Sequence, residues 1–533
     1  MAPRMHLTTL SAAIRGVVAE IVRIEVTMEP TGFPGFAMVG LPGAAVRESR
    51  VRVLNALDHV GYRFGDRHIV VNLAPADLPK SGSALDLALA VALLGAAGVV
   101  PAEAVASTML VGELGLRGSI RPVSGVLPFM VRARQDRMAC AIVPAGNAAE
   151  AALVGGIDVR AAEDLAGVVD HLRDQRPLPA GDQPDLGERP APSPDMTEIR
   201  GQNAAKRAAE GAAAGGHNLL LSGPPGAGKT MIARALAGIL PPMSGDAMIE
   251  PAAGHSAGGL LRRGVRYLRC RPFRAPHHSV SIAGLVGGGG IPRPGEVSLA
   301  HNGVLFLDEM PEFGGYALDM LREPLEEGRV TIARASGVTA MPARFTLVGA
   351  MNPCRCGHAG DPKGRCRCTD SDKRAYVARL SGPLLDRIDI RIGVPSLSYK
   401  DISDSRPSES SASVLERVVR ARCLQAERRA RLGLPEGSNA TLPGGSLDVV
   451  CALDPAAKLL VEKVVKGQGL SARGYTRVLK VARTVADLGG RAVVRDDDVA
   501  EAVHYSRDIR EEEAAAVVQK GRQVAGAWGV MES

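Results

Sequence analysis

Apolar residues along this chain are spaced differently in different regions. In the middle of the chain, short apolar runs at residues 219–221 and 304–307 stand directly before glycine-rich or acidic segments, which is typical of buried parallel strands. Toward the C-terminal end, apolar residues recur at helical spacing, as in SVLERVVRARCLQAERRARL and TRVLKVARTVADL. The pattern therefore predicts α/β structure first and helices afterwards.

Composition divides the chain further. The stretch from residue 174 to residue 196 is rich in Pro, Gly and Asp and poor in apolar residues, so we expect a linker there. We expect an α/β domain over residues 1–173, a second α/β domain with a parallel sheet over residues 197–402, and a helical domain over residues 403–533. A chain of 533 residues is long enough for several cores, since one core stops growing at about 250–300 residues.

Charge and hydropathy limit the partners and the cellular compartment that we expect. A net charge of +7 over 533 residues permits an acidic polymer as partner but does not require one. The longest apolar run, at residues 84–100, contains Asp86 and is too short to cross a bilayer, and the N-terminus lacks the apolar core of a signal peptide. We expect a cytoplasmic protein with no membrane partner, and the eight cysteines of such a protein argue against a disulfide framework.

A phosphate-binding loop follows the apolar run at residues 219–221 and matches the pattern G-x-x-x-x-G-K-[ST]. Its glycines let backbone N–H groups turn inward around phosphate oxygens at the start of a helix. Lys229 is expected to reach the β and γ phosphates of ATP, and Thr230 to bind Mg²⁺. The predicted ATP-binding loop consists of Gly223, Pro224, Pro225, Gly226, Ala227, Gly228, Lys229 and Thr230.

An acidic pair ends the second apolar run. Asp308 and Glu309 would then lie at the C-terminal edge of the same sheet, where ligands bind in parallel sheets. We expect Asp308 to hold the magnesium ion and Glu309 to polarise the attacking water, because phosphoryl transfer depends on positioning and charge neutralisation. Alone, this pair is equally typical of a solvated strand end, and the upstream phosphate loop favours the catalytic interpretation.

Segments farther along resemble parts of an AAA+ ATPase. FTLVGAMNPC is similar to the AAA+ sensor strand, which implies that Asn352 helps to orient the water. SGPLLDRIDI resembles the segment with an arginine finger, which implies that Arg387 acts on the nucleotide of a neighbouring subunit. GYTRVLKVARTVADL looks like the second sensor helix, with Arg477 as the γ-phosphate arginine and Arg473 as the alternative. The catalytic residues thus implied are Lys229, Glu309, Asn352 and Arg387.

Two longer stretches narrow the resemblance, namely RPFRAPHHSVSIAGLVGGGGIPRPGEVSLAHNGVLFLDE and LREPLEEGRVTIARASGV. They are similar to the magnesium-chelatase-like branch of AAA+ proteins, and within it to the ComM (YifB-type) family. That resemblance implies a Lon-like N-terminal domain of the ribosomal S5 domain 2 type, an AAA+ domain and a helical lid. It also implies a DNA helicase and branch-migration motor in recombination during natural transformation, assembled as a homo-oligomeric ring, with a hexamer expected, on single-stranded or branched DNA.

A predicted hairpin lies before the sensor strand, in GRVTIARASGVTAMPARF. Related replicative helicases place a pore loop at this point, so the resemblance implies that Arg334 meets DNA phosphates. The alternative, which the sequence favours equally, is that Arg334 is an exposed hairpin residue that binds no ligand.

The N-terminal segment resembles the Lon protease fold in VNLAPADLPKSGSALDLALAVALL and GELGLRGSIRPVSGVL. At the step where Lon peptidases have the nucleophilic serine this chain has Ala84, and at the step of the lysine base it has Leu127. Ser81 and Ser83 lack a recognisable base, and a serine without a base is a weak nucleophile. We therefore expect no peptidase activity.

Four cysteines lie within the predicted insertion at residues 354–368, CRCGHAGDPKGRCRC. A hairpin would bring the two C-x-C pairs together into the tetrahedral thiolate site that structural Zn²⁺ prefers, with His358 as a possible substitute for one thiolate. Reduced thiols in a basic loop are the alternative. The predicted zinc ligands are Cys354, Cys356, Cys366 and Cys368.

Alternative functions remain open from the sequence. A metal-insertion chaperone like the magnesium chelatase ATPase subunit would remodel a protein partner, and the resemblance of the N-terminal segment to Lon counts against it because the chelatase motor subunits are expected to lack such a domain. An ATP-dependent peptidase is opposed by Ala84 and Leu127 at the dyad positions.

Overall fold

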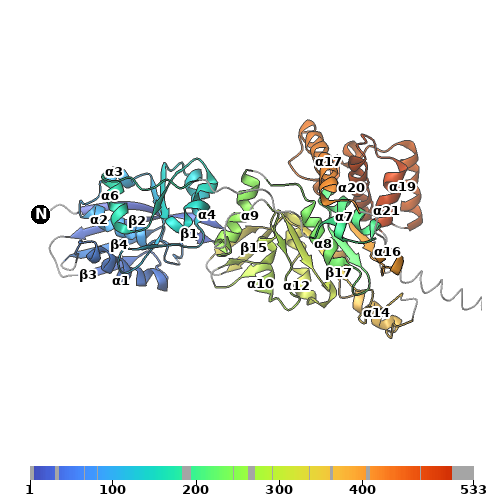
Figure 1. Ribbon diagram of the computed structural model, residues 1–533, viewed down its shortest axis with the longest axis horizontal. Helices are drawn as coiled ribbons and strands as arrows, with labels where there is room; N and C mark the ends of the chain where they lie inside the picture. Colours follow the sequence, from blue (N-terminus) through green and yellow to red (C-terminus); the bar gives the residue numbers. More distant parts are fainter. Residues whose placement is uncertain are drawn as a thin grey trace, which may run out of the picture.

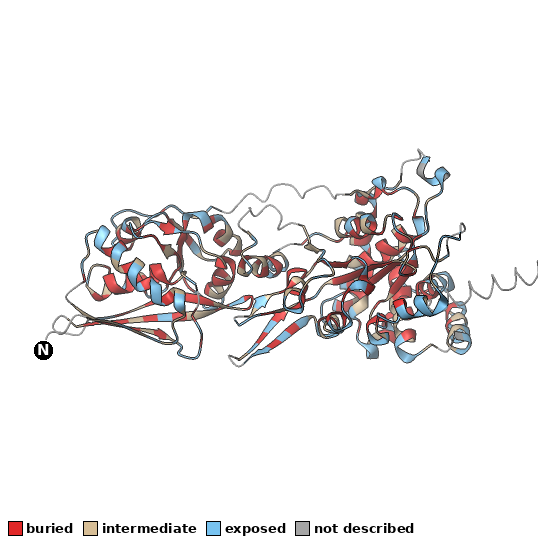
Figure 2. Cartoon of the chain, turned by 90° about the horizontal axis from the view of Figure 1, so that it is seen from below, coloured by how far each residue is buried: buried red, intermediate tan, exposed pale blue. Residues whose placement is uncertain are grey.

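A computed structural model of the chain describes residues 5–29, 35–64, 67–80, 82–182, 194–243, 245–261, 270–290, 292–334, 337–360, 364–403, 408–468 and 470–506. Ser81, residues 183–193 of the predicted linker and residues 507–533 of the predicted helical domain lie outside these ranges. The described parts form an elongated molecule, with the N-terminal sheet at one end, a second sheet in the middle and helices at the other end (Figure 1). Figure 2 shows the buried residues gathered inside each of these parts.

The N-terminal part is built on a mixed sheet of seven strands in the order β3-β4-β2-β1-β5-β8-β9. A long antiparallel ribbon forms its centre, because β1 pairs with β2 along the whole length of β1. The strands are β1 (Met5–Arg15), β2 (Val18–Glu29), β3 (Gly35–Val39), β4 (His68–Ala74), β5 (Thr108–Leu110), β8 (Cys140–Pro144) and β9 (Asp158–Ala162). The main helices are α1 (Ala44–His59), α2 (Asp86–Ala96), α4 (Val126–Gln135) and α6 (Leu165–Leu172).

Helix α2 contains most of the longest apolar run, and it is a core helix of this domain. All but one of its eleven residues are buried, including Asp86 at its first position. Arg52 Nε donates to Asp86 Oδ2 at 2.6 Å, so the buried carboxylate is neutralised by a guanidinium from α1. Among the described residues, no helix has the length and apolarity needed to cross a membrane.

The central part holds a parallel sheet of five strands in the order β11-β14-β17-β10-β18. Its strands are β11 (Phe273–Arg274), β14 (Val304–Leu307), β17 (Thr346–Met351), β10 (Leu219–Ser222) and β18 (Ile390–Gly393). The run at residues 219–221 and the run at residues 304–307 are fully buried, as expected of inner parallel strands. Helices α7 (Asn203–Gly215) and α8 (Lys229–Gly238) pack in the same core.

The C-terminal part is helical, with α17 (Ser411–Arg431), α19 (Pro455–Gln468), α20 (Ala472–Leu488) and α21 (Asp496–Ser506) as its long helices. Their apolar faces join the central strands in one hydrophobic core, in which Val478 and Val485 of α20 share a cluster with Leu219 and Val304. The order of α/β structure followed by helices is therefore confirmed.

Candidate nucleotide site and cysteine cluster

Three strands bring the predicted nucleotide-binding residues to one edge of the central sheet. The phosphate loop follows β10, Asn352 follows β17, and Asp308 and Glu309 follow β14. Since β17 lies between β10 and β14 and all three run parallel, their carboxyl ends meet at the same edge. The strand order thus places Asn352 between the loop and the acidic pair.

Lys229 is the first residue of α8, and its ammonium group is held inside the loop. Its Nζ donates to the carbonyl oxygens of Gly223 at 2.5 Å and Pro224 at 2.9 Å, and to Asn352 Oδ1 at 3.1 Å. Burial lowers the pKa of Lys229, while the charges of Asp308 and Glu309 act in the opposite direction. The three acceptors match the three N–H donors of the ammonium, so each donor of Lys229 has a partner.

The turn of the loop depends on glycine at the helix start. Gly228 caps α8 with φ of 91° and Gly226 has φ of 76°, a region that side-chain-bearing residues rarely adopt. With this turn, the N-terminal N–H groups of α8 face the space above the sheet edge, where an anion is stabilised by the helix dipole.

Thr230 and Asp308 form a pair of oxygen ligands at the same edge. Thr230 Oγ1 donates to Asp308 Oδ2 at 3.0 Å. Two ligands at right angles around Mg²⁺ at 2.0–2.1 Å lie about 2.9 Å apart, so this spacing fits a shared magnesium ion. The donor set of one hydroxyl and one carboxylate also fits a hard cation.

Glu309 is held in an uncommon backbone conformation. Its φ is 49° and its ψ is 45°, in the left-handed region that a residue with a side chain adopts at a cost of about 1–3 kcal/mol. Its side chain is 55% exposed, and its Oε2 lies 3.9 Å from Nδ1 of His278. The carboxylate is thus largely exposed, with the His278 ring beside it.

His278 and His277 were missed by the sequence interpretation. Their rings lie 4.1 Å apart between centroids, and the His278 ring meets Phe313 edge-on at 6.4 Å. The sequence RAPHHS could have indicated them, because the two histidines follow the edge strand β11 by a few residues. In the sheet, β11 lies next to β14, the strand that ends before Asp308. A pair of histidines at the carboxyl edge of a parallel sheet is a reason to suspect a site.

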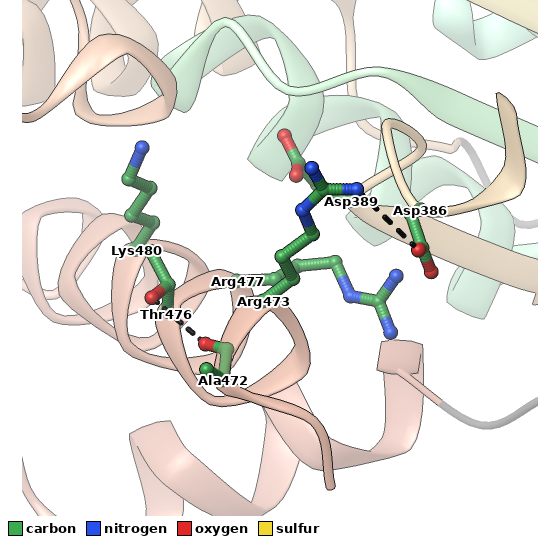
Figure 3. A pocket seen from close by; sticks show the side chains of 7 residues that line it. All are labelled: Asp386, Asp389, Ala472, Arg473, Thr476, Arg477 and Lys480. Carbon is green, nitrogen blue, oxygen red and sulfur yellow. Dashed lines mark hydrogen bonds and ion pairs between the residues drawn. The ribbon is translucent and has the colours of Figure 1, made fainter. Parts of the chain in front are cut away.

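Arg473 and Arg477 of α20 line a cavity to which no residue of the phosphate loop contributes. Asp386, Asp389, Ala472, Arg473, Thr476, Arg477 and Lys480 line one cavity of about 310 Å³, which we call the arginine pocket (Figure 3). In it, Arg473 reaches toward Asp386, and Arg477 Nη1 lies 3.5 Å from the carbonyl oxygen of Ile388. Within the described ranges, no hydrogen bond or ion pair joins the pocket to Lys229 or Asp308.

Arg387 itself is only 12% exposed and forms an ion pair with Glu326 of α13 (Arg322–Glu327). Its Nη1 donates to the carbonyl oxygen of Pro383 at 2.5 Å. The Nε atoms of Arg387 and Arg477 are both buried and have no hydrogen-bond partner in the described structure. A buried Nε is closed to solvent, so these two arginines contact their surroundings through their Nη atoms.

The four clustered cysteines come together as predicted from their spacing. The sulfur atoms all lie within 4.8 Å of one another, with Cys354 to Cys366 at 3.8 Å and Cys356 to Cys366 at 3.7 Å. Four thiolates around Zn²⁺ at about 2.3 Å lie about 3.8 Å apart in a tetrahedron, so the geometry fits zinc. His358 is outside this group of ligand atoms, so it does not take the place of a thiolate.

The cysteine cluster also contacts the phosphate loop. Gly357, with φ of 80°, packs so closely on Pro225 that an added Cβ would lie 2.8 Å from its Cδ. Cys354 is fully buried and stands two residues after Asn352. A metal bound by these thiolates would therefore fix both the loop and the end of β17.

The predicted hairpin is present as β15 (Arg329–Arg334) and β16 (Gly337–Pro342). Arg334 ends β15 and is exposed, and its only hydrogen bond in the described structure runs from Nη1 to the carbonyl oxygen of Ala333 at 3.2 Å. The turn residues 335 and 336 lie outside the described ranges. Arg334 therefore carries a charge that no acidic side chain of the described structure neutralises.

The N-terminal domain shows no serine–lysine pair at the expected positions. Ala84 and Leu127 pack in one apolar cluster. Ser83 donates to Glu113, and Lys80 is 1% exposed and donates to the carbonyl oxygen of Pro75. In the described structure, Ser83 and Lys80 therefore have separate partners and do not form a hydrogen bond with each other.

Family comparisons cover nearly the whole chain. The family described as magnesium chelatase, subunit ChlI, matches residues 195–402. The family described as subunit ChlI of Mg-chelatase matches residues 24–147, and the one described as its C-terminal part matches residues 408–506. The N-terminal domain thus falls in a family that is also described by the chelatase subunit, so its presence does not count against a chelatase-type function as the sequence argument assumed.

Full-length relatives agree with these matches. An uncharacterized protein of Mycobacterium tuberculosis is 44% identical over 93% of this chain and 97% of its own length. Competence protein ComM of Haemophilus influenzae is 42% identical over 94% of this chain and 97% of its own, and YifB of Escherichia coli is 41% identical over 92% and 95%. A short match of 27% identity joins 32% of this chain to 21% of a rice protein named Probable DNA helicase MCM9.

Proposed function

The chain belongs to the ComM and YifB family of magnesium-chelatase-like AAA+ proteins, and from this premise we propose that it is a ring-forming ATPase that moves branched or single-stranded DNA. The family supports ATPase activity directly. The observation that carries the DNA part is the full-length similarity to a protein named for competence, and the short MCM9 match adds a weaker hint.

ATP binds along the edge formed by β10, β17 and β14 in this proposal. Lys229 exchanges its contacts with the carbonyls of Gly223 and Pro224 for the β and γ phosphates. Thr230 and Asp308 hold Mg²⁺, which neutralises charge on the phosphates when bound. Glu309 and Asn352 hold the attacking water in line, and the open side of Glu309 leaves room for it.

Hydrolysis then requires a neighbouring subunit. Arg477 lines a pocket to which the chain's own phosphate loop contributes no residue, and Arg387 follows Asp386, which lines the same pocket. We therefore assign both arginines, with Arg473, to the γ-phosphate of the adjacent subunit. An arginine that must come from a neighbour makes turnover depend on a closed ring.

DNA contact is assigned to the hairpin of β15 and β16. Arg334 stands near its tip with no acidic partner in the described structure, which suits a phosphate contact. Contacts to the DNA backbone carry no sequence information, so binding should be insensitive to sequence. Affinity should also fall steeply as salt increases, because each neutralised phosphate releases counterions.

A chelatase-type motor that remodels a protein partner is the second candidate. The specific observation in its favour is that all three family descriptions, including the one over the N-terminal domain, name subunit ChlI. The two candidates share the ATP site and the ring, and they differ in whether DNA stimulates and is moved by the ATPase.

The decisive experiment uses the purified full-length protein with ATP, Mg²⁺ and three-way or four-way DNA junctions. We expect junction movement that requires hydrolysis, so the Glu309→Gln protein should bind the junction and leave it in place. Arg334→Ala should reduce movement, and its matched control is Arg329→Ala on the same strand, whose guanidinium is already paired with Glu327. A protein that neither binds DNA at low salt nor moves a junction would refute the DNA motor in favour of the protein-remodelling candidate.

A further inference from the structure

The N-terminal domain touches the proposed DNA-contact hairpin directly. Gly16 and Val17 form the tight turn between β1 and β2, because Arg15 pairs with Val18 across the ribbon. We call this the ribbon turn, and it projects from the N-terminal sheet against β16. We propose that the ribbon turn positions the hairpin that carries Arg334, so that the N-terminal domain couples ATP turnover to DNA movement. The proposal rests on the proposed function of that hairpin.

A hydrogen bond joins the two elements at their ends. Arg15 Nη2 donates to the carbonyl oxygen of Val338 at 2.9 Å, across a separation of 323 residues in sequence. The guanidinium is oriented from its own side by Glu20, whose Oε1 accepts from Arg15 Nη1 at 3.3 Å. Gly337, with φ of 123°, allows this approach, because a Cβ there would lie 2.5 Å from Arg15 Nη2 unless the flexible guanidinium moved.

Apolar packing completes the contact. Gly16, with φ of 69°, lies so close to Thr339 that an added Cβ would be 2.6 Å from its Cγ2. Val17 is only 6% exposed although it belongs to a turn, and it shares a hydrophobic cluster with Ile332 and Met341 of the hairpin. A turn residue of the N-terminal domain is thus part of the core beneath the hairpin.

Strand pairing alone does not fix the hairpin, whose buried face packs in one core with Leu285 and Val286 of the central part as well as with Val17. Its strands pair only with each other in a two-stranded sheet, and such a sheet is marginal without a packed face. On that face, Val330, Thr339 and Met341 are buried, while the opposite positions are exposed. Val17 supplies part of the cover, so removing it weakens the restraint on the end of β15 where Arg334 stands.

A second contact fixes the ribbon relative to the ATPase part. Helix α4 packs on α9 (Asp246–Ala257), with Arg134 Nη2 2.9 Å from Asp246 Oδ1. Ser256 Oγ donates to Glu150 Oε1 at 2.5 Å, and the amide of Leu127 donates to Ser256 Oγ at 3.3 Å. Because α4 is held on α9, the N-terminal domain is fixed relative to the ATPase part where the ribbon turn contacts the hairpin. Arg15 and Val17 therefore act as positioning residues.

The test compares Arg15→Ala and Val17→Ser in the full-length protein with the matched control Arg23→Ala, an exposed arginine on the same ribbon. Amide hydrogen exchange of residues 329–342 reports the hairpin without DNA, and junction movement per ATP hydrolysed reports coupling. We expect hairpin exchange to rise about tenfold in both variants, movement per ATP to fall, and ATP hydrolysis without DNA to persist. Arg23→Ala should match the wild type in each measurement.

Unchanged exchange of the hairpin in both variants, beside unchanged movement per ATP, would overturn the inference. Raised exchange spread evenly over the N-terminal domain would overturn it as well, since the variants would then act by unfolding that domain. If the wild-type protein fails to move DNA, the proposed function fails. The exchange measurement alone then decides whether the ribbon turn restrains the hairpin, so the two failures are distinguishable.

Discussion

Lys229→Ala should weaken ATP binding while leaving the fold intact. In the structure its ammonium has three hydrogen bonds to neutral acceptors, namely Gly223, Pro224 and Asn352. ATP would replace the carbonyl contacts with contacts to charged phosphate oxygens, which are stronger. The variant loses that gain and also the positive charge.

The size of the effect follows from this exchange. A hydrogen bond to a charged group contributes about 1.5–3 kcal/mol, which corresponds to a factor of about 10–150 in Kd. Because Lys229 gives up existing hydrogen bonds in the exchange, we expect the lower part of this interval, about 10- to 50-fold. Lys229→Met retains much of the buried stem of the side chain and should show a similar loss, which separates the charge from packing.

Equilibrium titration with a fluorescent ATP analogue and Mg²⁺ measures the Kd of each protein. Lys458→Ala is a suitable control, because Lys458 is exposed on α19. Thermal unfolding without nucleotide should show similar midpoints for wild type and Lys229→Met. An unchanged Kd for both Lys229 variants would refute the assignment of this loop as the phosphate site.

The other predictions test the remaining groups one at a time. Glu309→Gln should bind ATP with near wild-type affinity and lose at least about 100-fold in turnover, as steady-state phosphate release would show, and near-normal turnover would exclude it as the water-activating group. Arg387→Ala should bind ATP and fail to hydrolyse it, and mixing it with Glu309→Gln should restore part of the turnover at the mixed interfaces. Arg374→Ala is the control, because Arg374 is an exposed arginine. Normal ATP hydrolysis by assembled Arg387→Ala would show that Arg387 has a structural role. Elemental analysis of protein purified without added metal should find one zinc per chain, lost in Cys366→Ser and retained in the exposed Cys423→Ser, and a metal content far below one equivalent in the wild type would refute the zinc site.

The nucleotide site was predictable because its parts are local in sequence. A strand, a glycine turn and a helix start follow one another from residue 219 to residue 230, so the phosphate loop needs no tertiary information. Asp308 and Glu309 were predictable for a related reason, since they end an apolar run that is typical of a parallel strand. What the sequence left open was the order of the strands, which places Asn352 between them.

Other features depend on contacts between distant residues, and no local pattern reveals them. The ion pair of Arg387 with Glu326 and the position of Arg477 beside Ile388 arise where the turn after α15 (Gly382–Leu385) packs against α13 and α20. Val17 has a similar origin, because a valine in a two-residue turn predicts exposure unless another element covers it. His278 is an intermediate case, since its sequence position was conspicuous but its neighbour Glu309 is set by strand pairing.

Charged groups of the candidate site have intrachain partners in the single chain. Lys229 is paired with Asn352 and two carbonyls, Thr230 with Asp308, and Arg387 with Glu326. Each of these hydrogen bonds or ion pairs must break before the same group can contact ATP, Mg²⁺ or a neighbouring subunit. The buried Nε atoms of Arg387 and Arg477 have no such partner in the described structure. Because each existing contact must be given up, the binding of ATP and Mg²⁺ gains less free energy than the new contacts alone would contribute.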